Sequence, residues 1–423
     1  MNQEEFEKEA NSVSSILEDI LSKEKEVKIA TNDLDSDPKG AIPTGILGFD
    51  VYCGGGIFPG KIYEICGEES NGKSTLCYSI AAAYQRHDPK HLVMIVETES
   101  ALDKGRCQAI GMDLNRLIVF ETDIVEQGIS RIQWFMDTVA EKFEGEAKVL
   151  FIWDTIAAAS TLSEKERGMN SGGMMEKPRI LSEAFRKITT ELAKHKCSLI
   201  LINQVRDAIG GWKPGLSTPG GRAIRHHASV RLMVKSSTPI TETFGKEEKV
   251  IGNEVNIFML KNKLAQPRLT FGAVMNHATG FQRIESSHKT VMDMAVRDGV
   301  EVKGSWISIK LPDYLQERAK SEIKVQGGVK LLQLMRESLF LRVYMEYLGY
   351  KNYASMYPLM SLKYRHTIWE KEVQMIKCWN KDCSRYGGEP LPQDLWPTEP
   401  DPVSKEEFTS INKEIILLNE DLD

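Results

Sequence analysis

The stretch IYEICGEESNGKST, residues 62–75, places a short apolar run directly before a polar loop bounded by glycines. Residues 67–74 fit the pattern G-x-x-x-x-G-K-[ST], and the helical sequence STLCYSIAAAYQR overlaps the end of the stretch. Strand, loop and helix in this order are the setting in which the pattern binds nucleotide phosphates, because the glycines let backbone N–H groups wrap them. The helix N-terminus adds positive potential. We therefore predict a nucleoside triphosphate site at this loop.

The loop also supplies candidates for individual roles. Lys73 would neutralise the β and γ phosphates, and the Ser74 hydroxyl would bind Mg²⁺. We accordingly expect ATP and Mg²⁺ as cofactors. The predicted nucleotide contacts within the loop are Gly67, Glu68, Glu69, Ser70, Asn71, Gly72, Lys73, Ser74 and Thr75.

Further apolar runs decide the fold class. They lie at residues 62–66, 91–97, 117–121, 149–154, 198–204, 229–235, 255–261 and 269–275. Helical segments separate several of them, among them residues 180–196, where Leu181, Phe185 and Leu192 share a face. Near-continuous apolar strands separated by helices are typical of a parallel sheet covered on both sides. The predicted class is α/β, with a mostly parallel, twisted sheet flanked by helices.

The chain is too long, at 423 residues, for one compact domain. Residues 1–41 contain an amphipathic helix followed by a turn-rich linker, and such a helix must bury its apolar stripe on the core or on a neighbouring subunit. We assign residues 42–285 to the nucleotide-binding core and 286–390 to a small, mainly helical C-terminal domain. Residues 391–423 form an acidic tail that begins with the proline-rich linker LPQDLWPTEPDP.

Net charge and cysteine usage indicate the setting in which the protein acts. The net charge is −6, but residues 399–423 alone hold eight acidic and two basic side chains. The rest of the chain carries 52 acidic and 52 basic side chains and is therefore neutral overall. Seven cysteines without a framework spacing favour reduced thiols and a cytoplasmic location. Among them Cys378 and Cys383 lack a second ligand pair, which argues against zinc. No apolar run approaches membrane-spanning length, so we expect no membrane partner.

Carboxylates close two of the apolar runs. VLFIWD ends in Asp154, where folds of this kind place the carboxylate that supports Mg²⁺. Glu97 and Glu99 close another run, and residues two apart point to the same side of an extended chain. One of the two could deprotonate the attacking water, although the pattern does not choose between them.

Several segments, taken together and in order, resemble the RecA recombinase family over roughly residues 42–285. They are PTGILGFDVYCGGGIFPGKIYEICGEESNGKST, IVETESALD, LILINQVRDAIG, GGRAIRHHASVRL and MLKNKLAQP. The resemblance implies a RecA-like phosphate-loop core. It also aligns Glu99 with the catalytic base, Asp103 with an adenine contact, and Gln204 with the polar group that registers the γ phosphate.

The resemblance further implies a site shared between subunits. In this family ATP lies between subunits of a helical filament, and the equivalents of Lys261 and Lys263 reach the γ phosphate of the neighbouring protomer. Two lysines separated by Asn262 would project to one side of a strand. The helix within residues 1–41 would join the subunits.

Two glycine-rich loops are expected to bind DNA. The first, ERGMNSGGMMEKPR at 166–179, leads into a helix, and the second, GGWKPGLSTPGGRAIRHH at 210–227, carries cations suited to a phosphate backbone. The predicted DNA contacts are Arg179, Arg186, Lys213, Gly220, Gly221, Arg222 and Arg225. The chain departs from the family pattern at His226 and His227, which replace an aromatic pair, and at Arg106, which replaces a tyrosine that stacks on adenine.

The function implied by the resemblance is a DNA-dependent ATPase that forms helical filaments on single-stranded DNA and carries out homologous pairing and strand exchange in recombination and repair. Expected partners are single-stranded DNA, homologous double-stranded DNA, further copies of the chain, and single-strand-binding and loader proteins. A hexameric helicase on the same nucleotide core is an alternative and predicts closed rings. An ATP-binding regulatory switch is another, and it predicts an ATPase rate that single-stranded DNA leaves unchanged.

Overall fold

The computed structural model describes residues 40–167, 176–207, 216–219, 221–244, 247–281, 299–319, 323–356 and 358–401. The elements up to residue 281 are α2 (Leu47–Tyr52), β1 (Ile62–Gly67), α3 (Lys73–His87), β2 (Leu92–Glu97), α4 (Lys104–Ile110), η2 (Leu114–Arg116), β3 (Leu117–Glu121), α5 (Val125–Lys142), β4 (Val149–Asp154), α6 (Leu162–Arg167), α7 (Glu176–Lys194), β5 (Ser198–Gln204), β6 (Arg206–Asp207), β7 (Leu216–Ser217), α8 (Gly221–His227), β8 (Val230–Phe244), β9 (Glu247–Asn262), β10 (Thr270–Asn276) and β11 (Gly280–Phe281). The elements from residue 300 onward are β12 (Val300–Lys303), β13 (Trp306–Ile309), α10 (Asp313–Gln316), β14 (Ile323–Gln326), α11 (Gly328–Glu337), α12 (Leu339–Met356), α13 (Pro358–Asp382), η4 (Cys383–Tyr386) and η5 (Gln393–Leu395).

A nine-stranded sheet organises the first part of the chain, in the order β11-β10-β9-β8-β1-β5-β4-β2-β3. The strands from β8 to β3 in this order pair in parallel, whereas β9, β10 and β11 pair antiparallel at one edge. All eight apolar runs of the sequence lie in strands of this sheet. The predicted α/β class with a mostly parallel sheet is confirmed.

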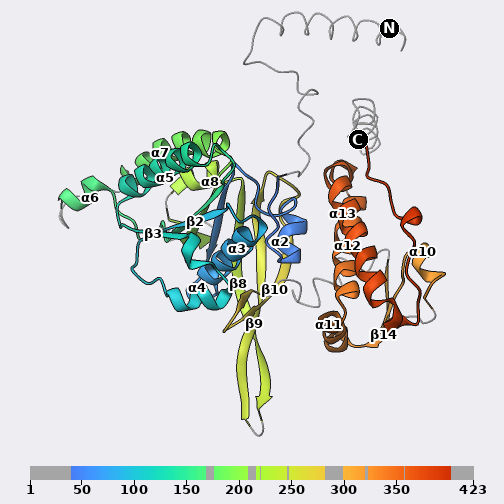
Figure 1. Ribbon diagram of the computed structural model, residues 1–423. Helices are drawn as coiled ribbons and strands as arrows, with labels where there is room; N and C mark the ends of the chain where they lie inside the picture. Colours follow the sequence, from blue (N-terminus) through green and yellow to red (C-terminus); the bar gives the residue numbers. More distant parts are fainter. Residues whose placement is uncertain are drawn as a thin grey trace, which may run out of the picture.

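Both faces of the sheet are covered by helices, which explains the continuous apolar runs. Neighbouring residues of β1 face opposite layers: Ile62 packs with α5 and α7, whereas Tyr63 and Ile65 pack with α3. Figure 1 shows α5, α7 and α8 together on one side of the sheet and α3 and α4 on the other. The phosphate loop therefore joins a strand and a helix that are both held by the core.

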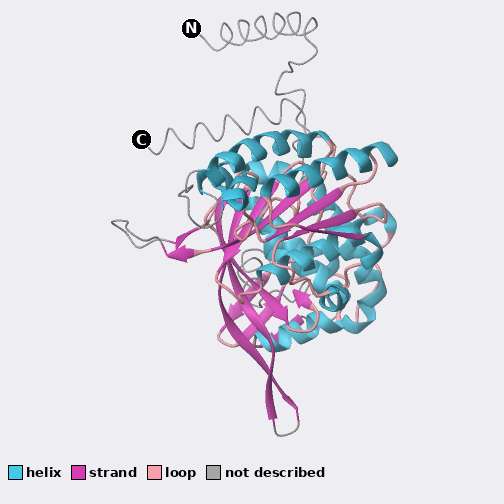
Figure 2. Ribbon diagram, turned by 90° about the vertical axis from the view of Figure 1, so that its left-hand side faces the viewer, coloured by secondary structure: helices cyan, strands magenta, loops and turns pink. Residues whose placement is uncertain are grey.

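The β8–β9 hairpin projects well beyond the sheet (Figures 1 and 2). The two strands pair from Val230 and Asn262, at the sheet, to Phe244 and Glu247, at the outer end of the hairpin. The apolar pattern predicts strands only at 229–235 and 255–261, because most of the described residues between them are exposed and polar. The outer half of the hairpin is held by backbone hydrogen bonds between the two strands. Its described side chains do not pack on a core, so the sequence there lacks the alternation of apolar and polar residues that predicts a strand.

The elements after residue 299 form a second apolar cluster. β12, β13 and β14 make a three-stranded antiparallel sheet, and α12 supplies buried aromatic side chains such as Phe340 and Tyr344. Leu47 and Val51 of α2 join this cluster, and the Tyr364 hydroxyl donates a 2.7 Å hydrogen bond to the Val51 carbonyl. Helix α2 thus connects the two apolar cores.

The proline-rich segment at 390–401 differs from the predicted linker. Leu391 is buried, and the Trp369 indole of α13 donates a 3.1 Å hydrogen bond to the Pro397 carbonyl. Trp396 also packs against the second apolar cluster. The apolar side chains of LPQDLWP therefore bind this segment to α13, whereas its proline content alone indicates a linker.

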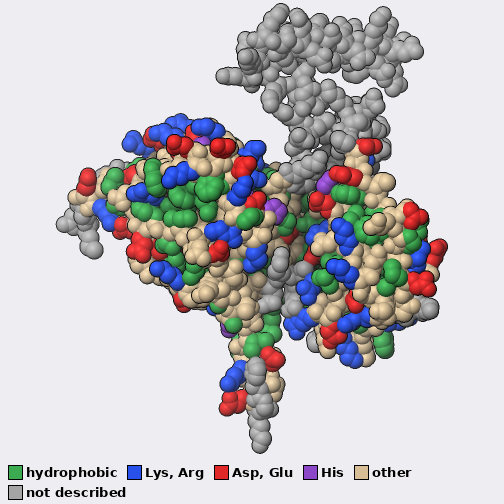
Figure 3. All heavy atoms as spheres, viewed as in Figure 1, with side chains coloured by type: hydrophobic (Ala, Val, Ile, Leu, Met, Phe, Trp, Pro, Cys, Tyr) green, Lys and Arg blue, Asp and Glu red, His purple; other side chains and the backbone are tan. Residues whose placement is uncertain are grey.

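The remaining predictions concern the two ends of the chain, the cysteines, membrane-spanning helices and the surface charge. The helix within residues 1–41 and residues 402–423 of the acidic tail lie outside the described residues. All seven cysteines are free and buried. Within the described ranges no helix is both long and apolar enough to cross a lipid bilayer. Figure 3 shows Lys and Arg side chains interspersed with Asp and Glu over the visible face, in keeping with the balanced charge of the chain outside residues 399–423.

Candidate nucleotide-binding site

The predicted site residues meet where parallel strands end. Gly67 at the end of β1 lies beside Gln204 at the end of β5, and Glu97 at the end of β2 lies beside Asp154 at the end of β4. The carboxyl ends of parallel strands share one edge of a sheet, where open α/β folds bind ligands. The sheet register therefore brings the phosphate loop, two carboxylates and the glutamine to one edge.

The phosphate loop closes on itself around Lys73. Gly72 has a φ of 86° immediately before α3, and a Cβ there would lie 2.5 Å from the Met275 sulfur. Only glycine is compatible with both conditions. The Lys73 ammonium donates a 2.5 Å hydrogen bond to the Glu68 carbonyl across the loop, and burial lowers the pKa of Lys73. A cation and the N-terminus of α3 thus converge on the loop.

Hydroxyl groups from α3 hold the carboxylate of Asp154. Tyr78 donates a 2.9 Å hydrogen bond to it, and Ser74 hydrogen-bonds to it as well. Burial raises the pKa of Asp154, and these two hydrogen bonds limit the rise. The oxygen atoms of Ser74 and Asp154 are the ligands that Mg²⁺ prefers, so the residues fit a magnesium ion at this position.

Glu97 and Glu99, alike in the sequence, have different surroundings. Glu97 is buried, and its carboxylate accepts a 3.0 Å hydrogen bond from the Glu99 amide and a 3.5 Å hydrogen bond from the Ala101 amide. Burial raises its pKa. Glu99 is exposed, and its carboxylate accepts a 3.1 Å hydrogen bond from the Thr155 hydroxyl. Glu97 therefore shapes the turn, while Glu99 is open to a ligand.

Asp103 and Arg106 lie at the start of α4. The Asp103 carboxylate accepts a 3.1 Å hydrogen bond from the Arg106 amide and so caps the helix. The Arg106 guanidinium donates to the Thr75 hydroxyl at 3.4 Å and to the His277 carbonyl. Arg106 thus reaches the end of the phosphate loop.

The lysine pair meets α8, the helix that forms the last part of the second predicted DNA loop. The Lys261 ammonium donates hydrogen bonds to the carbonyls of Arg225 at 2.6 Å and His226 at 3.0 Å. The pKa of His227 is lowered, first by burial and then by the nearby charges of His226, Lys263, Lys261 and Arg186. The fold therefore brings predicted residues from α7, α8 and β9 within electrostatic reach of one another.

The remaining predicted DNA contacts are partly described. Arg179 on α7 and Arg222 on α8 are exposed, and Gly221 begins α8. Lys213 and Gly220 lie outside the described residues, as do 168–175 of the first loop. Two residues just before the second loop pair with two residues inside it as a short antiparallel ribbon, Arg206 with Ser217 and Asp207 with Leu216.

A buried polar network that the motifs do not indicate links the second loop to the phosphate-loop strand. Glu64 of β1 forms an ion pair with Arg231 of β8 and accepts a 2.8 Å hydrogen bond from the Asn203 amide group. Asn203 also donates to the Pro219 carbonyl at 3.0 Å, and Arg231 donates to the Thr218 hydroxyl at 3.3 Å. Charged residues inside apolar strands are rare unless paired, which is the signal that could have identified Glu64 and Arg231.

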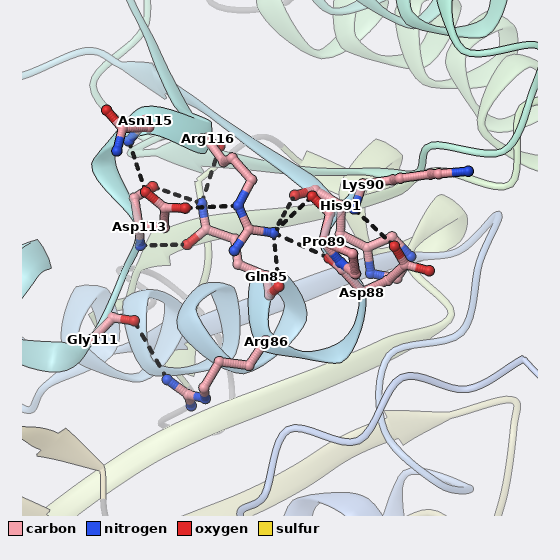
Figure 4. A network of polar contacts seen from close by, with 10 residues as sticks. All are labelled: Gln85, Arg86, Asp88, Pro89, Lys90, His91, Gly111, Asp113, Asn115 and Arg116. Atoms are coloured by element: carbon pink, nitrogen blue, oxygen red, sulfur yellow. Dashed lines mark hydrogen bonds and ion pairs between the residues drawn. The ribbon is translucent and has the colours of Figure 1, made fainter.

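A second missed network holds the far end of α3, as Figure 4 shows. The Arg116 guanidinium donates to the carbonyls of Gln85 at 2.9 Å, Asp88 at 3.1 Å and Pro89 at 3.2 Å, and to the Asp113 carboxylate at 2.8 Å. Carbonyls at a helix C-terminus lack partners within the helix and favour a cation. Arg116 thereby anchors the helix whose other end carries the phosphate loop.

Comparison with known proteins agrees with this geometry. Residues 11–282 match the RecA N-terminal domain. Protein RecA of Fusobacterium nucleatum is 31% identical over 302 residues, 71% of this chain and 75% of the relative. Protein RecA of Nautilia profundicola is 33% identical over 66% of this chain and 76% of the relative. Protein RecA of Petrotoga mobilis is 30% identical over 78% of this chain and 85% of the relative. The chain therefore belongs to the RecA family and is a recombinase and DNA-dependent ATP hydrolase that acts in strand exchange and DNA repair.

Proposed function

We propose that this chain performs the family reaction with ATP and Mg²⁺ bound at the phosphate loop and the strand ends beside it. The observation that carries the proposal is the register of the sheet, which sets Gly67 beside Gln204 and Glu97 beside Asp154 at one edge. Backbone N–H groups of the loop would hold the phosphates, and Lys73 would exchange the Glu68 carbonyl for phosphate oxygens. Asp103 would contact the adenine.

Bound Mg²⁺ would neutralise charge on the β and γ phosphates. Ser74 and Asp154 are our candidates for holding it, because their oxygen atoms already interact and Tyr78 keeps the carboxylate oriented. Arg106, which reaches Thr75, would add a guanidinium at the position where the family has an aromatic ring.

Glu99 is our candidate for the general base. It is the exposed member of the glutamate pair, and a base must be within hydrogen-bonding reach of the attacking water. Thr155 would orient its carboxylate through the 3.1 Å hydrogen bond. Glu97 would support the turn through the Glu99 amide.

Lys261 and Lys263 would complete the site of a neighbouring protomer. They lie near the end of β9, remote along the chain from the loop, and Lys263 is exposed. Two cations brought to one phosphate stabilise the charge that develops during phosphoryl transfer. The helix within residues 1–41 would join the protomers into a filament, and Gln204 would register the γ phosphate.

DNA would bind along the two glycine-rich loops. Proposed contacts are Arg179, Arg186, Lys213, Gly220, Gly221, Arg222 and Arg225; the last three are on α8, and the Arg225 carbonyl accepts a hydrogen bond from Lys261. Their cations would track the phosphate backbone of single-stranded DNA, to be paired with a homologous duplex. The division at 1–41, 42–285, 286–390 and 391–423 is part of the proposal, with the acidic tail competing with DNA for these cations.

We further propose a cytoplasmic location and interaction with single-strand-binding and loader proteins. The decisive experiment for the whole proposal is electron microscopy of the chain with single-stranded DNA and a slowly hydrolysed ATP analogue. Helical filaments are the expected result. Closed hexamers would favour the helicase, and an ATPase rate unchanged by single-stranded DNA, without filaments, would favour the regulatory switch.

A further inference from the structure

Three potential metal ligands meet where α5 and α7 lie side by side over the sheet (Figure 1). Asp137 belongs to α5, and Glu191 lies in the last turn of α7. His195 follows one residue after α7, and its amide donates a 2.9 Å hydrogen bond to the Glu191 carbonyl, so the helical turn continues to it. Residues four apart in such a turn share a face. The sequence motifs do not include any of the three.

The distances within this cluster are longer than those of a hydrogen-bonded ion pair. The His195 Nε2 atom lies 3.3 Å from Asp137 Oδ1 and 3.5 Å from Glu191 Oε2. Hydrogen bonds between charged nitrogen and oxygen are usually about 2.7–2.9 Å long. Among the described residues, Nε2 is buried and has no hydrogen-bond partner. A buried ring nitrogen without such a partner calls for a ligand.

A tetrahedral metal ion accounts for these distances. Zinc binds imidazole nitrogen at about 2.0–2.1 Å and carboxylate oxygen at about 2.0–2.2 Å, which makes the edges of its tetrahedron roughly 3.3–3.5 Å. The two separations from Nε2 match that edge, and all three ligand atoms lie within 4.8 Å of one another. Two edges of a coordination tetrahedron, both from His195 Nε2, are therefore already in place.

We propose that Asp137, Glu191 and His195 bind a divalent transition-metal ion of the zinc type, with water as the fourth ligand. Imidazole favours such ions over Mg²⁺, and the two carboxylates supply negative charge. The Asp137 side chain is 68% exposed, which gives the ion a path from solvent and leaves room for the water.

One neighbouring cation competes for the site. The Lys194 ammonium lies 3.5 Å from Glu191 Oε2, and its side chain is 65% exposed. Exposed ion pairs of this kind contribute little to stability, so the lysine can be displaced by a divalent ion. A protonated His195 between the two carboxylates is the competing arrangement and needs no metal.

The site would fasten the end of α7 to α5. Helix α7 begins at Glu176, within the last residues of the first predicted DNA loop, and β5, which follows it, ends at Gln204. A metal at the junction would fix the position of this helix on the sheet. The proposal does not depend on the ATPase site.

The test uses the full-length, tag-free chain without nucleotide, stripped with a chelator and dialysed against Zn²⁺ in excess Mg²⁺. We expect one zinc per chain in the wild type and loss of that zinc in His195→Asn. Glu183→Gln is the matched control, because Glu183 lies on the same helix and, within the described ranges, forms an ion pair with exposed Lys187 at 3.3 Å. It should keep the zinc. Zn²⁺ should raise the Tm of the wild type and of this control, but not that of His195→Asn.

Two further variants keep the test decisive if His195→Asn does not fold. Asp137→Asn, at an exposed position, should weaken zinc binding, whereas Lys194→Met should strengthen it. Co²⁺ should give the absorption of a tetrahedral site in the wild type and in Glu183→Gln, but not in His195→Asn. Equal zinc stoichiometry and affinity in the wild type, His195→Asn and Asp137→Asn would overturn the proposal. So would a purely pH-dependent stability difference without metal uptake, which would identify the protonated histidine.

Discussion

Lys261 on β9 donates a 2.6 Å hydrogen bond to the Arg225 carbonyl at the C-terminal end of α8. A cation at this end of a helix is electrostatically favourable. If Lys261 contacts the γ phosphate of a neighbour in the filament, it must leave this carbonyl. We predict that Lys261→Ala lowers the DNA-stimulated rate of ATP hydrolysis by about 10³-fold, by analogy with cations supplied in trans to phosphoryl transfer. The same loss is expected for Lys263→Ala.

Mixed filaments distinguish a shared site from an internal one. Glu99→Gln and Lys261→Ala are each expected to be inactive. In an equal mixture, about one quarter of the interfaces would pair an intact Glu99 with an intact Lys261 of the neighbouring protomer. ATPase activity should therefore return on mixing. An inactive mixture that still forms filaments containing both variants would place the lysine in the same subunit's site.

The two glutamates after β2 are expected to respond differently to amide substitution. Glu99→Gln should lower hydrolysis about 10²- to 10⁴-fold while nucleotide binding persists, because it removes the proposed base. Glu97→Gln should keep most activity, since its amide oxygen can still accept from the Glu99 amide. Single-turnover hydrolysis and nucleotide titration measure the two effects. Equal losses in both variants would contradict this assignment.

The buried ion pair of Glu64 and Arg231 provides a stability test. Glu64→Gln leaves the arginine charge without its partner, which should lower the free energy of unfolding by about 3–5 kcal/mol. The double variant Glu64→Gln with Arg231→Met should recover much of this loss, because no unpaired charge remains. Urea unfolding of the single and double variants checks both expectations. A double variant less stable than Glu64→Gln would show that the pair is not the source of the loss.

Arg116 should stabilise the whole of α3 through its C-terminal carbonyls. Arg116→Ala removes charged hydrogen bonds from the carbonyls of Gln85 and Asp88, so the free energy of unfolding should fall by about 1.5–3 kcal/mol. Arg116→Lys keeps the charge but not the planar group of donors, and an intermediate loss is expected. Thermal unfolding of the three proteins provides the measurement, and equal stability of Arg116→Ala and wild type would contradict the prediction.

Asp50 gives the stability a dependence on pH. Burial raises its pKa from 3.8 to about 7, although hydrogen bonds from Thr44 and Gly45 oppose the rise. Between these values the folded state holds a proton that the unfolded state releases. Its contribution is therefore fully present below about pH 4 and is lost as the pH rises towards 7. Asp50→Asn should flatten this part of the stability profile, and an unchanged slope between pH 4 and 7 would refute the assignment.

The sequence predicted the elements that repeat a strong local pattern. Apolar runs predicted the parallel strands because helices cover both faces of the sheet, and the glycine-lysine loop was predicted from its spacing and its neighbours. Its residues follow a strand and open a helix, so local order was sufficient. Asp154 was predicted to support Mg²⁺; it contacts Ser74 and Tyr78, and its role stays a prediction.

Features that depend on distant residues were not predictable in the same way. Glu97 and Glu99 are equivalent in an extended strand, but the turn buries one and exposes the other. Arg116 and the carbonyl of Gln85 meet only because η2 lies against the end of α3. The hairpin beyond residue 235 is stabilised by strand pairing, which leaves no periodic signal in its polar side chains.

The burial of all seven cysteines has a practical consequence for studying motion in this protein. A thiol reagent can react with them only when the surrounding structure opens, so labelling rates report local unfolding without any engineered probe. Cys66 and Cys77 flank the phosphate loop, whereas Cys378 and Cys383 lie in the C-terminal cluster. Mass spectrometry of timed alkylation can therefore compare the opening of the two cores within a single chain.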